Sequence, residues 1–291
     1  MRTLDLGEIE ADLLVFGGPY SNLQALRALR REAGRRGLGP DRCICTGDVV
    51  AYCADPVASV DEIRDWGVRV VAGNCEEQLA ADSEECGCGF EDGTLCQVLA
   101  EQWYAFARRS LGADERGWMA ALPDRIALTA AGRRIVAIHA AHDSTSRFIF
   151  ASTDGAVKEE AIAALGADIV LAGHSGLPFT QRLAGGVWHN AGAIGIPAND
   201  GTPATWYSLM AATAGRRLAV SHHRLAYDHR AAAAAIRAAG LGEGYARALE
   251  TGLWPSLDVL PRAERARTGR PIRPGSFEIG ADAGLRGRGR R

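Results

Sequence analysis

Two short apolar segments, each followed by a glycine and an oxygen-bearing side chain, constrain this chain more than any other feature. Residues 43–45 lead into Gly47-Asp48, and residues 68–71 lead into Gly73-Asn74. In an open α/β sheet, ligands bind at the carboxyl ends of the strands. Glycine lets the backbone approach a charged ligand, and Asp or Asn supplies a hard oxygen. Either dipeptide alone is a common turn, but two together favour a metal or anion site.

Two histidines occupy similar positions further along the chain. His139 follows a strand predicted at residues 134–138, and His174 follows Gly173 after a strand predicted at residues 168–171. A single buried histidine usually just forms hydrogen bonds with neighbouring groups. Four candidate ligands after four strands instead favour a metal site. A carboxylate, an amide oxygen and two imidazoles suit Mn, Zn or Fe better than calcium. We therefore expect a transition-metal ion on a set formed by Asp48, Asn74, His139 and His174.

The order of the predicted elements is typical of an α/β fold. Helices are expected from Leu23 to about Gly34, from Pro56, and at residues 100–111, 115–122, 153–165, 231–239 and 244–250. Besides the four segments above, strands are expected at residues 11–16, 125–128, 187–189, 205–209 and 218–222.

Three regions are expected along the chain. Residues 1–261 form the main domain, and residues 77–124 interrupt it as a cysteine-containing helical insertion that acts as a lid or a subunit contact. Residues 262–291 hold nine arginines against three acids and no apolar periodicity. That composition predicts a flexible basic tail.

Composition narrows the setting of the protein. The 291 residues are 47% hydrophobic and carry a formal net charge of −2, which gives no global field for nucleic acid or membranes. No apolar run reaches the ~18–20 residues of a membrane span, and the first residues lack a signal sequence. We expect a cytoplasmic protein, and its seven cysteines, an odd number, fit reduced thiols better than a disulfide framework. Self-association of the chain stays open.

Six segments match, in order, the sequence motifs of a known family. They are residues 21–23, 47–48 with 55–56, 73–76, His139, 173–179 and 190–195. The chain thereby resembles the calcineurin-like metallophosphoesterase superfamily, especially its small bacterial phosphodiesterase branch, over about residues 10–260. The resemblance implies a four-layer αββα sandwich of two mixed β-sheets flanked by helices. It also implies metal-dependent hydrolysis of a small phosphorylated substrate.

Three positions depart from the family pattern. Gly18, Tyr20 and Gly176 stand where the family has ligands of a first metal ion, whereas Asp48 and the other ligands of the second ion are present. The resemblance therefore implies a reduced centre with one ion per chain. Tyr20 is a candidate to restore part of the first site as a phenolate ligand of ferric iron, although a tyrosine at a strand end more often packs.

Three further residues are candidates for catalysis beside His139. His142 and Arg147 follow it in the same loop. His142 is a candidate phosphate contact or replacement metal ligand, and Arg147 is a candidate phosphate clamp, although each is otherwise a solvated side chain. Cys75 stands where many members of the family carry a histidine thought to assist catalysis.

A loop with Cys86, Cys88 and Cys96 is the other unusual feature, with Cys75 or Cys53 as further partners. It could hold a metal or act in redox chemistry, but the usual paired spacing is absent, so free thiols are the default. These features leave three candidate functions. The leading one is a phosphoric ester hydrolase acting on a phosphomonoester, phosphodiester or nucleotide. The others are an inactive pseudo-phosphatase that binds a metal and a ligand or protein partner, and a redox or metal-handling protein.

Overall fold

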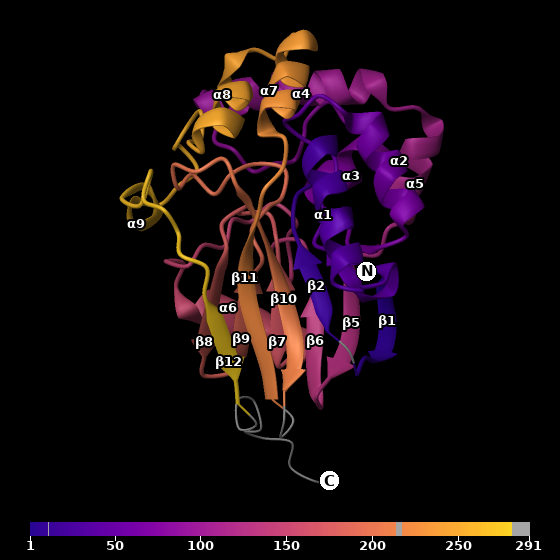
Figure 1. Cartoon of the computed structure of the whole chain (residues 1–291), viewed down its shortest axis with the longest axis vertical. Helices are drawn as coiled ribbons and strands as arrows, with labels where there is room; N and C mark the ends of the chain where they lie inside the picture. The colour runs from indigo at the N-terminus through magenta and orange to yellow at the C-terminus, as the bar shows by residue number, and fades with distance from the viewer. Residues whose placement is uncertain (11, 214–216, 281–291) are drawn as a thin grey trace.

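The chain forms two β-sheets that pack face to face between layers of helices (Figure 1). The computed structural model describes residues 1–10, 12–213 and 217–280. A core of apolar side chains from both sheets fills the space between them, including Val15 and Ile44 of one sheet and Ile135 and Leu171 of the other. The expected αββα sandwich is therefore confirmed.

The first sheet has six strands in the order β1-β5-β6-β7-β9-β8. Its strands are β1 (Thr3–Glu8), β5 (Arg125–Ala130), β6 (Arg133–Ala137), β7 (Ile169–Ala172), β9 (Gly186–Asn190) and β8 (Phe179–Leu183). Strands β6 and β7 run parallel, and β5 and β6 form an antiparallel hairpin around Ala131 and Gly132, which both have positive φ. That geometry is typical of tight hairpin turns.

The second sheet also has six strands, in the order β12-β11-β10-β2-β3-β4. They are β12 (Ser276–Ile279), β11 (Arg217–Leu225), β10 (Thr205–Thr213), β2 (Leu13–Phe16), β3 (Cys43–Cys45) and β4 (Arg69–Val70). Strands β2, β3 and β4 run parallel to one another, while β10, β11 and β12 are antiparallel. Both sheets are therefore mixed.

Helices pack against both sheets, and most of them gather at one end of the strands, where α4 (Leu95–Ser110), α7 (His229–Ala238) and α8 (Glu243–Thr251) lie at the top of Figure 1. Apolar residues of α6 (Gly155–Leu165) form a core with β6, β7 and β9. The larger core lies on the other sheet and joins it to α1 (Leu23–Arg35), α2 (Pro56–Trp66), α4, α7 and α8. Asn22 caps α1 by accepting a hydrogen bond from the backbone N–H of Ala25, as its sequence position predicts.

The region predicted as an insertion carries α3 (Asn74–Ala80), α4 and α5 (Ala113–Ala121). Helix α4 begins five residues before its predicted start because Thr94 caps it, accepting a hydrogen bond from the backbone N–H of Gln97. Helix α3 was not expected. It starts at Asn74 itself, so this candidate ligand lies in the first turn of a helix.

The segment predicted as a flexible tail is folded where the structure describes it. Residues 262–280 contain α9 (Arg262–Arg265) and the edge strand β12, which pairs with β11 from Leu218–Ile279 to Ser221–Ser276. The prediction failed because backbone pairing with β11 needs no apolar periodicity in the tail. Ala11 and residues 281–291 of the sequence predictions lie outside the described residues. Within those described, no helix is long and apolar enough to cross a membrane.

Candidate metal centre

Four side chains predicted as ligands converge where β3, β4, β6 and β7 end. The Nε2 atom of His139 lies 3.1 Å from Asn74 Oδ1, 3.1 Å from His174 Nδ1 and 3.3 Å from Asp48 Oδ2. Among the described residues, the potential ligand atoms of Asp48, His139 and His174 all lie within 4.8 Å of one another. Each sheet contributes two of the four side chains, so packing of the sheets assembles the cluster.

The backbone at two of these residues has an unusual conformation. Asp48 has φ 56° and His174 has φ 58°, in the left-handed region that side chains other than glycine rarely occupy. Each follows a glycine, and Gly47 is tightly surrounded. A Cβ atom on Gly47 would lie 2.8 Å from His139 Nδ1 and 2.8 Å from the backbone nitrogen of Gly73. Strain of this kind is typical of functional sites.

A buried carboxylate holds the two ligand-bearing turns together. Glu76, in the first turn of α3, accepts hydrogen bonds from the backbone N–H groups of Asp48 (2.8 Å), Val49 (2.8 Å) and Gly73 (2.9 Å). Its side chain is fully buried. The carboxylate of Asp48 in turn accepts a 3.3 Å hydrogen bond from the backbone N–H of Cys75 through Oδ1, which leaves Oδ2 facing His139.

The arrangement of lone pairs suits a cation. His139 Nδ1 lies 2.6 Å from the carbonyl oxygen of Thr46, so Nδ1 carries the proton and donates it there. The lone pair of Nε2 then faces the oxygens of Asp48 and Asn74 and the Nδ1 atom of His174. Acceptor atoms this close repel one another unless a positive charge lies between them. A proton on Nε2 or a metal ion would supply that charge, and histidine, carboxylate and amide ligands suit Zn, Mn or Fe.

The pKa values of the clustered side chains also indicate that a positive charge is favoured among them. Burial alone would lower the pKa of His139, but the charge of Asp48 and the hydrogen bonds outweigh it and raise that pKa to about 9. Burial opposes the effect of His139 on Asp48, yet the pKa of Asp48 is lowered. Burial and the neighbouring His139 lower the pKa of His174 to about 3. Burial and Asp48 raise the pKa of Glu76 to about 7. Positive charge is thus favoured at the His139 Nε2 atom.

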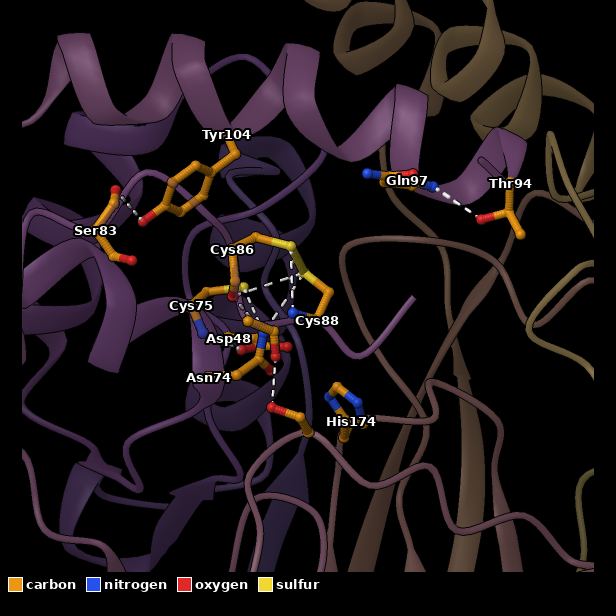
Figure 2. The surroundings of a disulfide bond; sticks show 12 residues. Asp48, Asn74, Cys75, Ser83, Cys86, Cys88, Thr94, Gln97, Tyr104 and His174 are labelled. Carbon is orange, nitrogen blue, oxygen red and sulfur yellow. Dashed lines mark hydrogen bonds between the residues drawn. A yellow bond between two sulfur atoms is a disulfide. The ribbon is translucent and has the colours of Figure 1, made fainter. Parts of the chain in front are cut away.

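The amide of Asn74 is oriented by a cysteine loop. Its Nδ2 atom donates to the carbonyl oxygen of Cys86 at 2.9 Å and lies 3.5 Å from the Sγ atoms of Cys75 and Cys88. Figure 2 shows Asn74 and Asp48 close together beneath the disulfide. With its nitrogen engaged on that side, the amide presents Oδ1 to His139.

The cysteine loop differs from the sequence prediction. Cys86 and Cys88 form a disulfide, whereas reduced thiols were expected throughout (Figure 2). Cys96 is a separate free thiol on α4, and Cys53 and Cys75 are buried and free. The two bonded cysteines are brought together by a turn at Gly87, which has positive φ. A metal held jointly by Cys86, Cys88 and Cys96 is not compatible with this pairing.

The three positions that depart from the family pattern lie around one aromatic ring. Gly18 adopts φ 30°, and a Cβ atom there would come within 2.2 Å of the Tyr20 ring. A Cβ atom on Gly176 would lie 3.9 Å from the Tyr20 hydroxyl. The Tyr20 ring packs edge-on against the ring of Tyr52, with 4.7 Å between the ring centroids. Burial and the charge of Asp48 raise the pKa of Tyr20 well above 10, which disfavours a phenolate.

The predicted catalytic residues lie in different surroundings. Cys75 is buried beneath the site and contacts Asn74. His142 and Arg147 lie on the loop after His139, and each faces Asp143, at 3.8 Å and 3.2 Å. The Arg147 side chain is 48% exposed. Within the described chain, neither side chain forms a hydrogen bond or ion pair with the four converging ligands, so their roles in catalysis stay predictions.

Three contributors were missed by sequence reasoning. Glu76 was seen only as part of a motif, and Thr46 contributes through its backbone carbonyl, which no side-chain pattern reveals. Phe148 was also missed; its ring centroid lies 4.2 Å from that of His174. The signal that could have found Glu76 was its position three residues after Gly73, the spacing of a capping carboxylate.

Sequence comparisons place the chain among known proteins. A family model described as a calcineurin-like phosphoesterase superfamily domain matches residues 21–215. An uncharacterized protein of Methanocaldococcus jannaschii is 23% identical over 188 residues, or 64% of this chain and 71% of that protein.

Two solved structures share the fold. A metallophosphoesterase from Sphaerobacter thermophilus superposes with TM-score 0.65 at 22% identity, covering 84% of this chain and 100% of that one. A hypothetical protein from Pyrococcus horikoshii superposes with TM-score 0.69 at 16% identity, covering 84% of this chain and 99% of that one. The matched family supports a phosphoric ester hydrolase. Because the family model spans most of the sequence and the fold agrees, the chain belongs to the calcineurin-like phosphoesterase superfamily.

Proposed function

We propose that the protein hydrolyses a small phosphomonoester, phosphodiester or nucleotide through one transition-metal ion. Asp48, Asn74, His139 and His174 would hold the ion. The observation that carries this proposal is the convergence of their acceptor atoms on His139 Nε2, at 3.1–3.3 Å. When bound, such an ion polarises a phosphoryl oxygen and lowers the pKa of a water molecule.

The protein's own contribution is to fix and shield this centre. Thr46 sets the tautomer of His139, and Glu76 fixes the turn that carries Asp48. Because the converging side chains are buried, their interactions with a phosphate are less screened than in water. His142 and Arg147 would exchange their contacts with Asp143 for phosphate oxygens and stabilise the developing negative charge.

A pocket beside His174 supports an ester with an apolar part. His174 and Gly176 line it together with aromatic side chains, which are Tyr20, Tyr52, Phe90, Phe148, Tyr245 and Trp254. Planar or apolar groups pack well against such rings. The free volume of this pocket is about 50 Å³, which admits only a small apolar group of an ester whose phosphorus lies near the metal ligands.

The test is metal-dependent hydrolysis of an aryl phosphomonoester and an aryl phosphodiester, with Mn, Zn or Fe added to metal-stripped protein. We expect turnover with at least one metal, and a loss of at least 100-fold in Asp48→Asn and His139→Ala. Asp92→Asn and His229→Ala, which lie outside the site, serve as matched controls and should keep full activity. Unchanged turnover in Asp48→Asn and His139→Ala would refute the proposed site.

A second function is favoured by the surroundings of Tyr20. Its ring fills the space beside Gly18, where the family has a ligand of the first ion. A pseudo-phosphatase that binds a metal and a phosphorylated ligand without turnover would explain that replacement. Saturable phosphate binding that requires His174, with no hydrolysis under any of the three metals, would support this alternative.

A further inference from the structure

A hollow of about 420 Å³ lies on the other side of the loop that follows His174. Its walls come from four parts of the chain: Ala151, residues 177–179, residues 198–200, and the C-terminal segment between Leu260 and Arg273. None of the four candidate metal ligands lines it. The hollow is therefore separate from the proposed catalytic site, and a ligand bound there would serve a role beyond the proposed function.

The C-terminal wall of this hollow is fixed in place by hydrogen bonds. The backbone N–H of Gly269 donates to the carbonyl oxygen of Asn199 at 2.9 Å, and that of Ile272 donates to Asp200 Oδ2 at 3.0 Å. Asn199 Nδ2 also donates to the hydroxyl of Thr268 at 3.0 Å. The described part of the segment predicted as a flexible basic tail is thus held in place and forms one side of the hollow.

Three arginines of that wall line the hollow. They are Arg267, Arg270 and Arg273, spaced three residues apart. No hydrogen bond or ion pair joins any of their guanidinium groups to another part of the described chain. Each side chain is exposed, so its donors are available to a ligand.

The acidic residues of the hollow do not fully neutralise these arginines. Asp200 Oδ2 is paired with Arg224 at 2.7 Å and also accepts the Ile272 N–H. Glu264 is buried and accepts hydrogen bonds from the backbone N–H and the hydroxyl of Ser152, at 2.9 and 2.5 Å. Asp200 is neutralised by Arg224, and the charge of Glu264 offsets only part of the charge of the arginines. Three guanidinium groups against one unpaired carboxylate therefore leave the lining of the hollow with a net positive charge.

We propose that this hollow binds a small phosphate compound with several negative charges, of which pyrophosphate is the simplest. Guanidinium groups bind phosphate oxygens through paired, charge-assisted hydrogen bonds. Three of them around one concavity suit a ligand with more than one phosphoryl group. Apolar side chains, including Leu177, Phe179 and Ile272, form the rest of the lining and give room for an organic substituent.

The location links the hollow to the loop of His174. Leu177 and Phe179 belong to the stretch that begins at this candidate ligand, and Phe179 opens strand β8. A ligand in the hollow would contact that stretch directly, only a few residues from the metal centre.

Isothermal titration calorimetry, with pyrophosphate titrated into the full chain, tests the proposal. The protein is first stripped of metal and freed of chelator, so that the result does not depend on the metal centre or on hydrolysis. We expect saturable binding by the wild type, and at least a tenfold weaker affinity in the triple variant with Arg267, Arg270 and Arg273 each changed to Gln. The single variant Arg270→Gln should weaken binding severalfold.

The matched control carries the same change in charge elsewhere. Arg31, Arg109 and Arg230 are exposed and form no ion pair within the described chain, and changing all three to Gln should leave the affinity within twofold of the wild type. Absence of binding by the wild type would overturn the proposal. An equal loss in both triple variants would also overturn it, because it would show only a general response to net charge.

Discussion

Glu76 and Asp48 are joined by a buried hydrogen bond of 2.8 Å between the carboxylate of the first and the backbone N–H of the second. The same carboxylate holds Val49 and Gly73. One side chain thus fixes the turn after β3 and the turn after β4, which carry two of the four candidate ligands.

Glu76→Gln should therefore weaken both the fold and the metal centre. An amide offers one acceptor oxygen where the carboxylate has two, so at least one of the three backbone N–H groups is left buried without a partner. We expect unfolding to become easier by about 1–3 kcal/mol and metal affinity to fall by about tenfold or more. Urea denaturation and metal titration measure the two effects. Glu77→Gln is the neighbouring control, and equal behaviour of the two variants would contradict the role of Glu76.

Tyr20→Phe should leave the number of bound ions unchanged. The structure packs the Tyr20 ring against Tyr52, and burial disfavours its phenolate. Removing the hydroxyl should then change little beyond local packing. Elemental analysis of the variant beside the wild type is the measurement. A lost ion, or a visible absorption band present only in the wild type, would instead establish Tyr20 as a ligand of ferric iron.

Reduction of the Cys86–Cys88 disulfide should weaken metal binding. The Cys86 carbonyl accepts the hydrogen bond that orients the Asn74 amide, and the disulfide holds that turn together. Reduction adds two electrons and two protons and frees the turn. We expect an affinity loss of about tenfold, the usual effect of disturbing a group that orients a ligand.

The control for this prediction is a pair of variants. With a phosphine reductant, the Cys96→Ser protein should respond as the wild type does. A protein with Ser at positions 86 and 88 should show the weakened affinity with or without reductant. Identical affinity of oxidised and reduced wild type would contradict the coupling.

Acid should destabilise the fold through two neighbouring histidines, the buried His189 and the partly buried His222. Thr180 Oγ1 lies 2.9 Å from His189 Nδ1 and 3.0 Å from His222 Nε2, and His189 Nε2 lies 2.7 Å from the hydroxyl of Ser208. Burial and the neighbouring His223 lower the pKa of His222 from 6.5 to about 4. Burial and His222 also lower the pKa of His189 well below 6.5.

The sign of the effect comes from proton linkage. Between pH 6.5 and 4 the unfolded chain binds a proton at His222 that the folded protein does not, so stability falls as pH falls through this window. The loss from His222 is on the order of 3 kcal/mol. Urea denaturation from pH 7 to 4.5 measures how the free energy of unfolding changes with pH. This free energy should fall less steeply for His222→Gln than for the wild type and for His229→Gln. Parallel slopes in all three proteins would count against it.

The four candidate ligands could be predicted because each follows its strand directly. Asp48 and Asn74 come a few residues after short apolar strands, and His139 and His174 do the same in the other sheet. Strand ends of parallel sheets share one edge, so local sequence sufficed to place them together. The resemblance to a known family supplied the two-sheet architecture that brings both edges to one place.

What the sequence did not reveal depends on long-range contacts. The three missed strands, β1, β8 and β12, each lie at a sheet edge and bury few side chains, so they lack the apolar pattern of the inner strands. The role of Thr46 depends on its backbone carbonyl, which no residue pattern displays, and the three backbone partners of Glu76 come together only in the folded chain. The Cys86–Cys88 bond likewise depends on the turn at Gly87.

The central claim is that Asp48, Asn74, His139 and His174 hold one metal ion. Elemental analysis of protein purified without chelator tests it most directly, with the wild type beside His174→Ala and a His229→Ala control. We predict about one transition-metal ion per chain in the wild type and the control, and a loss of that ion in His174→Ala. A wild type with no ion, or a His174→Ala protein that keeps the full metal content, would contradict it.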